Sequence, residues 1–308
     1  MSHSTRPFYL YGLFQRPLMI CIAFLIAALL CSFLQWGQPG NVSVVIALDL
    51  SSSTYNSGSG QLGAAGTVSD EAIKAVKSYI NLNSQSLKRP NTIKVLGFGG
   101  AVVDLTKDFS NDATALTGAI DAAIQPNSPN NVAQRVIPSA TDVNIAVQKG
   151  LTDLSTAKQG CKELLVFTDG QAELNPSLTT QAIASGVKLN FMILGDPVQN
   201  LQADALKTGG LYLAANAASQ LTSAFTQQFF PKVNSNLNWV IICLGAAWLA
   251  LMWALVLPID RFLQKTMSLR FDLAGRIAIG HGLFWSSATP IIVWNILKIL
   301  QLPLFSKC

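Results

Sequence analysis

The chain has 308 residues, of which 50% are hydrophobic and only 12% are charged, and its formal net charge is +5. So few charged residues are unusual for a soluble protein and indicate membrane-spanning segments. Residues 36–237 contain 13 Lys and Arg against 14 Asp and Glu, so the positive charge lies in the flanks. That distribution points to membrane topology. It argues against nucleic-acid binding, because no basic stripe with interleaved aromatic residues is present in this middle region.

The first segment, residues 1–36, combines a short basic tail with an apolar run. The tail carries Arg6 and Arg16 without an acidic residue, and residues 17–34 are uncharged. A run of that length is sufficient to cross a bilayer. A cleaved signal peptide is the alternative, but its apolar part is usually shorter, and no small-x-small cleavage site follows. We therefore expect a retained transmembrane signal anchor.

The middle segment, residues 37–235, alternates short apolar runs with amphipathic stretches. Such alternation predicts an α/β fold with a doubly wound, mostly parallel sheet that is flanked by transmembrane helices in the rest of the chain. Gly99-Gly100 is typical of a hairpin between two of the strands. Strands are expected at 42–49, 93–98, 101–105, 163–168, 188–194 and 211–215, and helices at 68–87, 112–124, 142–154, 176–185, 201–207 and 218–230.

Several kinds of catalytic and structural site are excluded from the middle segment by its composition. The only histidines of the chain are His3 and His281, and the only cysteine of the segment is Cys161. It therefore holds no internal disulfide, Ser-His-Asp triad, Cys-His pair or histidine-based zinc site.

The last segment, residues 236–308, contains two further candidate spans at 239–258 and 277–297. The second is more polar, so a re-entrant or surface-lying segment is its alternative. The link between them is rich in Arg and Lys and is either a basic amphipathic helix on the membrane surface or a solvated loop. The positive-inside rule then places this link and the N-terminus in the cytoplasm. We expect an integral membrane protein whose middle domain is extracytoplasmic, or periplasmic in a bacterium.

Oxygen-bearing side chains follow two of the expected buried strands. Asp49, Ser51 and Ser53 follow the first strand, and Asp169 follows a later one in the sequence Thr-Asp-Gly. Thr141 precedes a helix in Ser-Ala-Thr-Asp. Ligands of open α/β sheets bind beyond the carboxyl ends of the strands, and hard oxygen donors suit Mg²⁺, Mn²⁺ or Ca²⁺. The alternatives are ordinary turns at the two Asp residues and a helix cap at Thr141 or Asp142.

These three pieces, in this order and context, resemble the von Willebrand factor A domain family over roughly residues 40–232. The resemblance implies a metal ion-dependent adhesion site in which Asp49, Ser51 and Ser53 bind or orient the ion. Thr141 would add a hydroxyl, and Asp169 would act directly or through water. An open coordination position would then accept a carboxylate from a protein partner. The loop Thr54–Thr67 is longer than is usual in the family, and it either contacts the partner or is a spacer.

The resulting hypothesis is a membrane-anchored, non-catalytic module for metal-dependent protein–protein interaction. It would act as a scaffold or assembly factor, or as a subunit of a membrane complex, with Mg²⁺ (or Mn²⁺ or Ca²⁺) as cofactor. One alternative is a phosphoryl-transfer hydrolase with Asp49 as nucleophile. Such sites usually need a second acidic residue, where this chain has Ser51. Another is a structural subunit whose metal site is vestigial.

Overall fold

The computed structural model describes residues 9, 11–34, 42–55, 61–125, 132, 135–157, 160–170, 173–234 and 237–300. The N-terminal tail and parts of the two long loops, residues 56–60 and 126–131, lie outside the described residues. The chain forms two compact units. One is a central domain built from residues 39–234, and the other is a helical unit built from the segments before and after it.

The central domain contains a six-stranded sheet in the order β3-β2-β1-β4-β5-β6. Strand β3 runs antiparallel to β2, and the other neighbouring strands are parallel. The predicted doubly wound, mostly parallel sheet is therefore confirmed. The strands are β1 (Ser43–Asp49), β2 (Thr92–Phe98), β3 (Val102–Asp104), β4 (Lys162–Thr168), β5 (Val187–Leu194) and β6 (Tyr212–Ala215).

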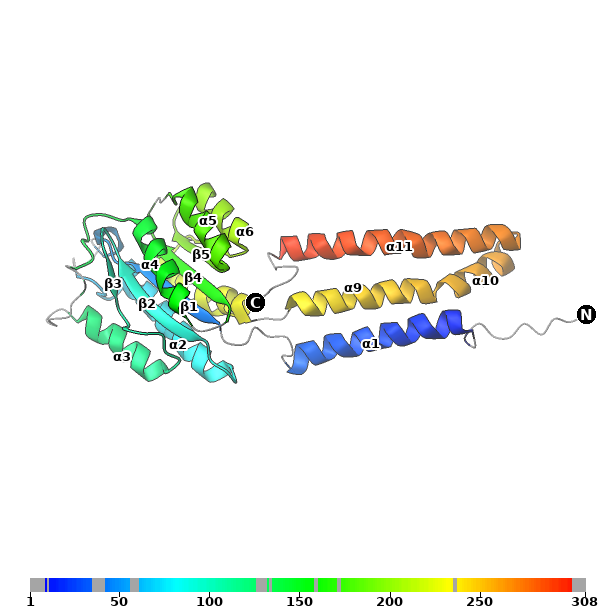
Figure 1. The fold of residues 1–308 in the computed structure, drawn as a ribbon, viewed down its shortest axis with the longest axis horizontal. Coiled ribbons are helices and arrows are strands. Elements are labelled where there is room, and N and C mark those ends of the chain that lie inside the picture. The colour runs from blue at the N-terminus through cyan, green and yellow to red at the C-terminus, as the bar shows by residue number, and fades with distance from the viewer. Residues whose placement is uncertain are drawn as a thin grey trace, which may run out of the picture. The chain divides into compact units, whose positions relative to one another are not determined.

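Helices cover both faces of this sheet (Figure 1), and the alternation of side chains along β1 explains why. Val44 and Ile46 belong to one core together with residues of α2 and α3, whereas Val45 and Ala47 belong to the other core with residues of α4, α5 and α6. A strand that is apolar on both sides needs such double cover. The helices are α2 (Val68–Ser86), α3 (Ala113–Ile124), α4 (Val143–Thr156), α5 (Pro176–Ser185) and α6 (Gln199–Thr208).

The helical run after β6 differs from the single helix expected at 218–230. It starts as a 3-10 turn, Ala218–Gln220, and continues as α7 (Leu221–Ser223), a π-helix at Ala224–Phe229 and α8 (Phe230–Asn234). Pro231 explains the widening, because it lacks an N–H and its ring clashes with the carbonyl one turn earlier. The run still places Phe225 and Phe229 against Tyr79, with ring centroids 6.4 and 5.6 Å away.

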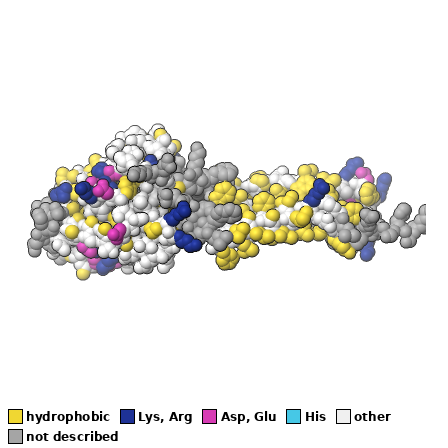
Figure 2. Space-filling model, turned by 60° about the horizontal axis from the view of Figure 1, so that its bottom comes forward, with side chains coloured by type: hydrophobic (Ala, Val, Ile, Leu, Met, Phe, Trp, Pro, Cys, Tyr) yellow, Lys and Arg dark blue, Asp and Glu magenta, His cyan; other side chains and the backbone are white. Residues whose placement is uncertain are grey.

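The helical unit consists of α1 (Gly12–Leu34), α9 (Leu237–Ala254), α10 (Val256–Thr266) and α11 (Phe271–Ile299). Within the described residues, three helical stretches are long and apolar enough to cross a membrane: Gly12–Phe33, Leu237–Thr266 and Phe271–Ile299. Figure 2 shows hydrophobic side chains over the visible face of these helices. The third stretch is the most polar, with a mean hydropathy of 1.3 against 2.2 and 2.5.

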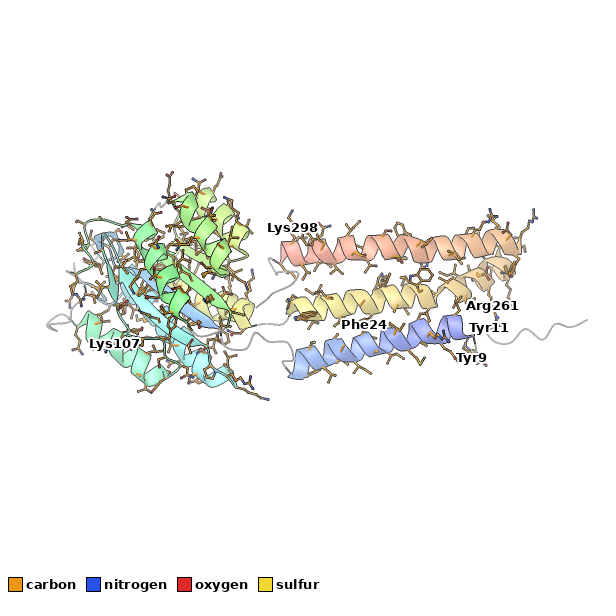
Figure 3. All side chains as sticks on the ribbon, in the orientation of Figure 1. Tyr9, Tyr11, Phe24, Lys107, Arg261 and Lys298 are labelled. Atoms are coloured by element: carbon orange, nitrogen blue, oxygen red, sulfur yellow. The ribbon has the colours of Figure 1, made fainter. Side chains whose placement is uncertain are left out.

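Polar residues of α11 contact α9 inside the helical unit. The indole Nε1 of Trp253 donates a hydrogen bond to the Ser286 hydroxyl at 3.0 Å, so this polar group faces a neighbouring helix. The expected link after residue 258 is helical as far as Thr266. Pro258 permits this because it lies in the first turn of α10, where its missing N–H is not needed. Arg261 of α10 lies over the ring of Tyr11, 5.3 Å from its centroid (Figure 3).

Candidate metal site

The candidate site lies at the carboxyl edge of the central strands. Asp49 ends β1, and Thr168 ends the neighbouring strand β4. Strand β1 pairs with β2 on one side and with β4 on the other, so the connections that follow β1 and β4 lead to opposite sides of the sheet. Such a reversal of strand order opens a crevice at the carboxyl ends, where doubly wound sheets bind their ligands.

The carboxylate of Asp49 is fully buried and is fixed at both oxygens. Its Oδ1 accepts hydrogen bonds from the backbone N–H of Ser51 at 2.9 Å and from the Ser51 hydroxyl at 2.5 Å. Its Oδ2 accepts a hydrogen bond from the hydroxyl of Thr168 at 2.6 Å. The side chain therefore has one orientation, directed by two neighbouring strands.

A chain of hydrogen bonds leads from Asp49 to the surface. The hydroxyls of Ser51 and Ser53 lie 3.0 Å apart, and the Ser53 hydroxyl donates to Asp169 Oδ1 at 2.9 Å. A short 3-10 turn, Ser52–Thr54, places the two serines on the same side of the loop. Four of the five predicted residues are thus brought together from two distant parts of the sequence, with Asp49 in the interior and Ser53 exposed.

The fifth predicted residue, Thr141, lies at the same edge of the sheet but is exposed. It precedes Asp142, whose backbone N–H donates to the carbonyl of Gly99 at 2.9 Å, just beyond the end of β2. Within the described part of the chain, no hydrogen bond joins the Thr141 side chain to the other four. Asp142 itself caps α4, since its carboxylate accepts a hydrogen bond from the backbone N–H of Asn144.

Sequence reasoning assigned no role to Thr168, although its hydroxyl contacts Asp49 directly. It is completely buried, and its Oγ1 also accepts a hydrogen bond from the backbone N–H of Gly170 at 3.2 Å. Its place before Asp169 in the Thr-Asp-Gly motif was the available signal. A polar residue at the end of a buried strand needs a partner, and Asp49 is that partner.

Electrostatics at the site favour a positive ion. Burial raises the pKa of Asp49, and the hydrogen bonds from Ser51 and Thr168 only partly oppose that rise. Burial also raises the pKa of Asp169, against the hydrogen bond from Ser53. Among the described residues, neither carboxylate forms an ion pair with Lys or Arg. A divalent cation between the two would favour their charged forms.

The donor set also fits such an ion. Two carboxylates and two or three hydroxyls are hard oxygen ligands, which Mg²⁺ prefers. Across the residues whose positions are described, no group of three or more His, Cys, Asp or Glu side chains forms a metal site of another type. The residues present therefore suit an oxygen-bound cation and do not suit zinc bound by Cys and His.

The strand order gives the fold, and the hydrogen bonds between the two loops give the arrangement of the site. The loop after β1 carries Asp49, Ser51 and Ser53, and Ser53 bonds to the Asp169 that follows β4 in Thr-Asp-Gly. With this strand order, the central domain resembles the von Willebrand factor A fold.

Comparisons with known proteins gave likenesses among solved structures. An aerotolerance-related membrane protein from Bacteroides fragilis is 15% identical, with a TM-score of 0.46, covering 61% of this chain and 98% of that one. A von Willebrand factor type A protein from Catenulispora acidiphila is 16% identical, with a TM-score of 0.48, covering 63% and 42%. Proximal thread matrix protein 1 from the mussel byssus, with a zinc-occupied MIDAS motif, is 14% identical, with a TM-score of 0.43, covering 62% and 48%. No protein-family model and no curated protein matches the sequence.

Proposed function

We propose that the von Willebrand factor A domain binds a divalent cation through Asp49, Ser51, Ser53, Thr141 and Asp169, and that the bound ion captures a carboxylate of a protein partner. The observation that carries this proposal is the hydrogen-bonded chain from Asp49 to Asp169. It collects oxygen donors of two loops at one edge of the sheet and leaves two carboxylates without a basic partner among the described residues. Mg²⁺ is the preferred ion of such a donor set, with Mn²⁺ and Ca²⁺ as alternatives.

Each residue would contribute in its own way to holding the ion. Thr168 and Ser51 orient Asp49, so its buried carboxylate is already in place before an ion arrives. The neutral serine hydroxyls add ligands without adding charge. Two carboxylates balance the two positive charges of the ion, so that a partner's carboxylate at an open position is attracted and not repelled. A bound ion would supply the Lewis-acidic contact to that carboxylate.

The same geometry supports a non-catalytic role. Both carboxylate oxygens of Asp49 accept hydrogen bonds, and the residue is fully buried, which does not suit a nucleophile. A phosphoryl-transfer site would also need a second acidic residue, and this loop offers Ser51 in that place.

The flanking helices support a role at a membrane. Their length and composition suit three spans that anchor the domain, with residues 1–36 before it and 236–308 after it. The basic residues of the N-terminal tail and of the corner between α10 and α11 support a cytoplasmic location for both, with the domain on the opposite side. We infer a scaffold or assembly role in a membrane complex.

Affinity purification of the detergent-solubilised full chain tests the proposal. In Mg²⁺ the wild type should retain partner chains that are lost in chelator and lost with Asp49→Ala. Thr179→Val serves as a matched control, because Thr179 is buried in α5 away from the site loops. Resistance of the domain to protease checks that each variant is folded. Capture that persists in chelator and in Asp49→Ala would contradict the proposal.

A further inference from the structure

Ile137 is an exposed apolar side chain at the edge of the sheet that carries the candidate metal site. Its side chain is 50% exposed. Within the described residues 42–234, the other large hydrophobic side chains of comparable exposure are Ile183 and Leu206, which lie in the last turns of α5 and α6. Single exposed apolar residues are common on protein surfaces, so the exposure of Ile137 is not informative alone.

The backbone of Ile137 is in a conformation that isoleucine disfavours. Its φ angle is +53°, in the left-handed region that glycine and asparagine adopt most readily. A β-branched side chain is especially unfavourable there, because its Cβ crowds the following carbonyl. An isoleucine at a position that suits glycine better points to a role of its side chain, of which one part lies against Gly100 and the other half is exposed.

The neighbouring backbone holds Ile137 in this conformation. We define the covering loop as residues 135–140. The carbonyls of Val136 and Ile137 accept hydrogen bonds from the N–H groups of Ala101 and Gly100, at 2.8 and 2.9 Å. Val136 is fully buried, which anchors the loop in the core. A side chain at Gly99 would meet the carbonyl oxygen of Val136 at 2.7 Å, so the loop lies directly against the end of β2.

A further hydrogen bond ties the covering loop to the candidate metal site. The backbone N–H of Ser52, between the two site serines, donates to the carbonyl of Pro138 at 2.8 Å. Pro138 follows Ile137, and Thr141 comes three residues later. The covering loop packs beside the end of β2, whereas Asp169 follows β4 on the other side of β1. Ile137 therefore lies on the β2 side of the rim, across the site from Asp169.

We propose that Ile137 contacts the partner and selects an apolar side chain close to the partner's acidic residue. This inference rests on the proposed function, because it adds a second contact to the partner that the metal site would bind. The expected occupant is an exposed peptide segment in which an Asp or Glu reaches the ion and an apolar residue, one to three positions away, packs on Ile137. The metal contact supplies charge recognition, and burial of apolar surface beside it supplies selectivity.

A displayed peptide library tests this contact on the detergent-solubilised full chain. The library holds a fixed Asp with randomised residues on both sides, and selection is carried out in Mg²⁺ and in chelator. The wild type should enrich apolar residues at one flanking position by about tenfold over polar residues. Ile137→Gly and Ile137→Asn should lose that enrichment while they still require both Mg²⁺ and the fixed Asp. Leu206→Gln, which changes an exposed apolar residue elsewhere, should keep it.

Stability separates loss of contact from loss of fold. Ile137→Gly should unfold within about 0.5 M urea of the wild type, because relief of the backbone strain offsets the loss of the half-buried side chain that lies against Gly100. Apolar enrichment that is absent in the wild type, or that survives in Ile137→Gly, would overturn the role of Ile137 and leave the metal site standing. If no wild-type binding depends on Mg²⁺ and on the fixed Asp, the proposed function and this inference both fail.

Discussion

Thr168→Val is expected to destabilise the central domain, because it removes the hydroxyl that donates to Asp49 Oδ2 at 2.6 Å. A hydrogen bond to a charged group contributes about 1.5–3 kcal/mol to stability. Asp49 keeps two donors from Ser51 on its other oxygen, so it is not left without partners. The change also removes the acceptor of the Gly170 N–H, at 3.2 Å. We therefore expect a loss of about 2 kcal/mol, most of it from the bond to Asp49.

Thr179→Val is the matched control for this change. Thr179 is also buried, at 4% exposure, but its hydroxyl has no hydrogen-bond partner among the described residues. Replacing an unsatisfied buried hydroxyl by a methyl group removes a desolvation penalty, so the effect should lie between zero and about 1 kcal/mol of stabilisation. The two variants thus remove the same atom type from two buried threonines, with opposite expected signs.

Pulse proteolysis in urea measures both effects on the detergent-solubilised full chain, since only the unfolded domain is digested. With a urea dependence of about 2 kcal/mol per molar, Thr168→Val should lower the unfolding midpoint by about 1 M. Thr179→Val should leave the midpoint unchanged or raise it slightly. Equal midpoints for the two variants would show that the bond between Thr168 and Asp49 contributes nothing, and would refute the pre-ordered carboxylate.

Three further predictions concern the packing, the titration and the orientation of the chain. Gly99→Ala should destabilise the domain by about 1–3 kcal/mol, because its methyl group would meet three backbone carbonyls of the covering loop. The control Gly118→Ala, in the open part of α3, should stabilise the domain by up to about 1 kcal/mol. Equal urea midpoints for the two variants would contradict the close packing at Gly99. Burial raises the pKa of Glu163 above its ordinary value of 4.5, although Lys188 and Asn190 act to lower it. The protonated acid therefore stabilises the fold fully below pH 4.5, and this stabilisation is lost as pH rises through the raised pKa of the folded state. The stability of Glu163→Gln relative to the wild type should therefore increase from acidic to neutral pH in urea titrations, and a difference that is independent of pH would count against it. A membrane-impermeant amine label added to right-side-out vesicles should modify exposed lysines of the folded central domain, such as Lys107, and the same label added to inside-out vesicles should not. The reverse result would invert the proposed orientation.

Much of the sheet could be predicted because its central strands are apolar on both faces. The runs that became β1 and β4 can be buried only in the middle of a two-sided fold. Parallel neighbours end at the same edge, so the residues after them must meet. This geometry predicts that the loops carrying Asp49, Ser51, Ser53 and Asp169 meet, and the hydrogen bonds of the site join them.

Other features depend on contacts that a linear pattern does not contain. The role of Thr168 requires the register between β1 and β4, which places the ends of the two strands side by side. The left-handed backbone of Ile137 is held by two hydrogen bonds from residues distant in the sequence. Gly100 donates to the carbonyl of Ile137, and Ser52 donates to the carbonyl of Pro138. The π-helix before Pro231 was missed because apolar periodicity alone does not report how a helix accommodates a following proline.

The divalent-cation site is tested most directly by counting Mn²⁺ ions bound to the purified full chain, with electron paramagnetic resonance to follow free Mn²⁺. The wild type should bind one ion that Mg²⁺ displaces. Ser53→Ala should bind it more weakly, and Asp49→Asn should not bind it at all, while both variants keep a protease-resistant domain. Absence of binding by the wild type, or equal binding by Asp49→Asn, would contradict the assignment of this edge of the sheet as a metal site.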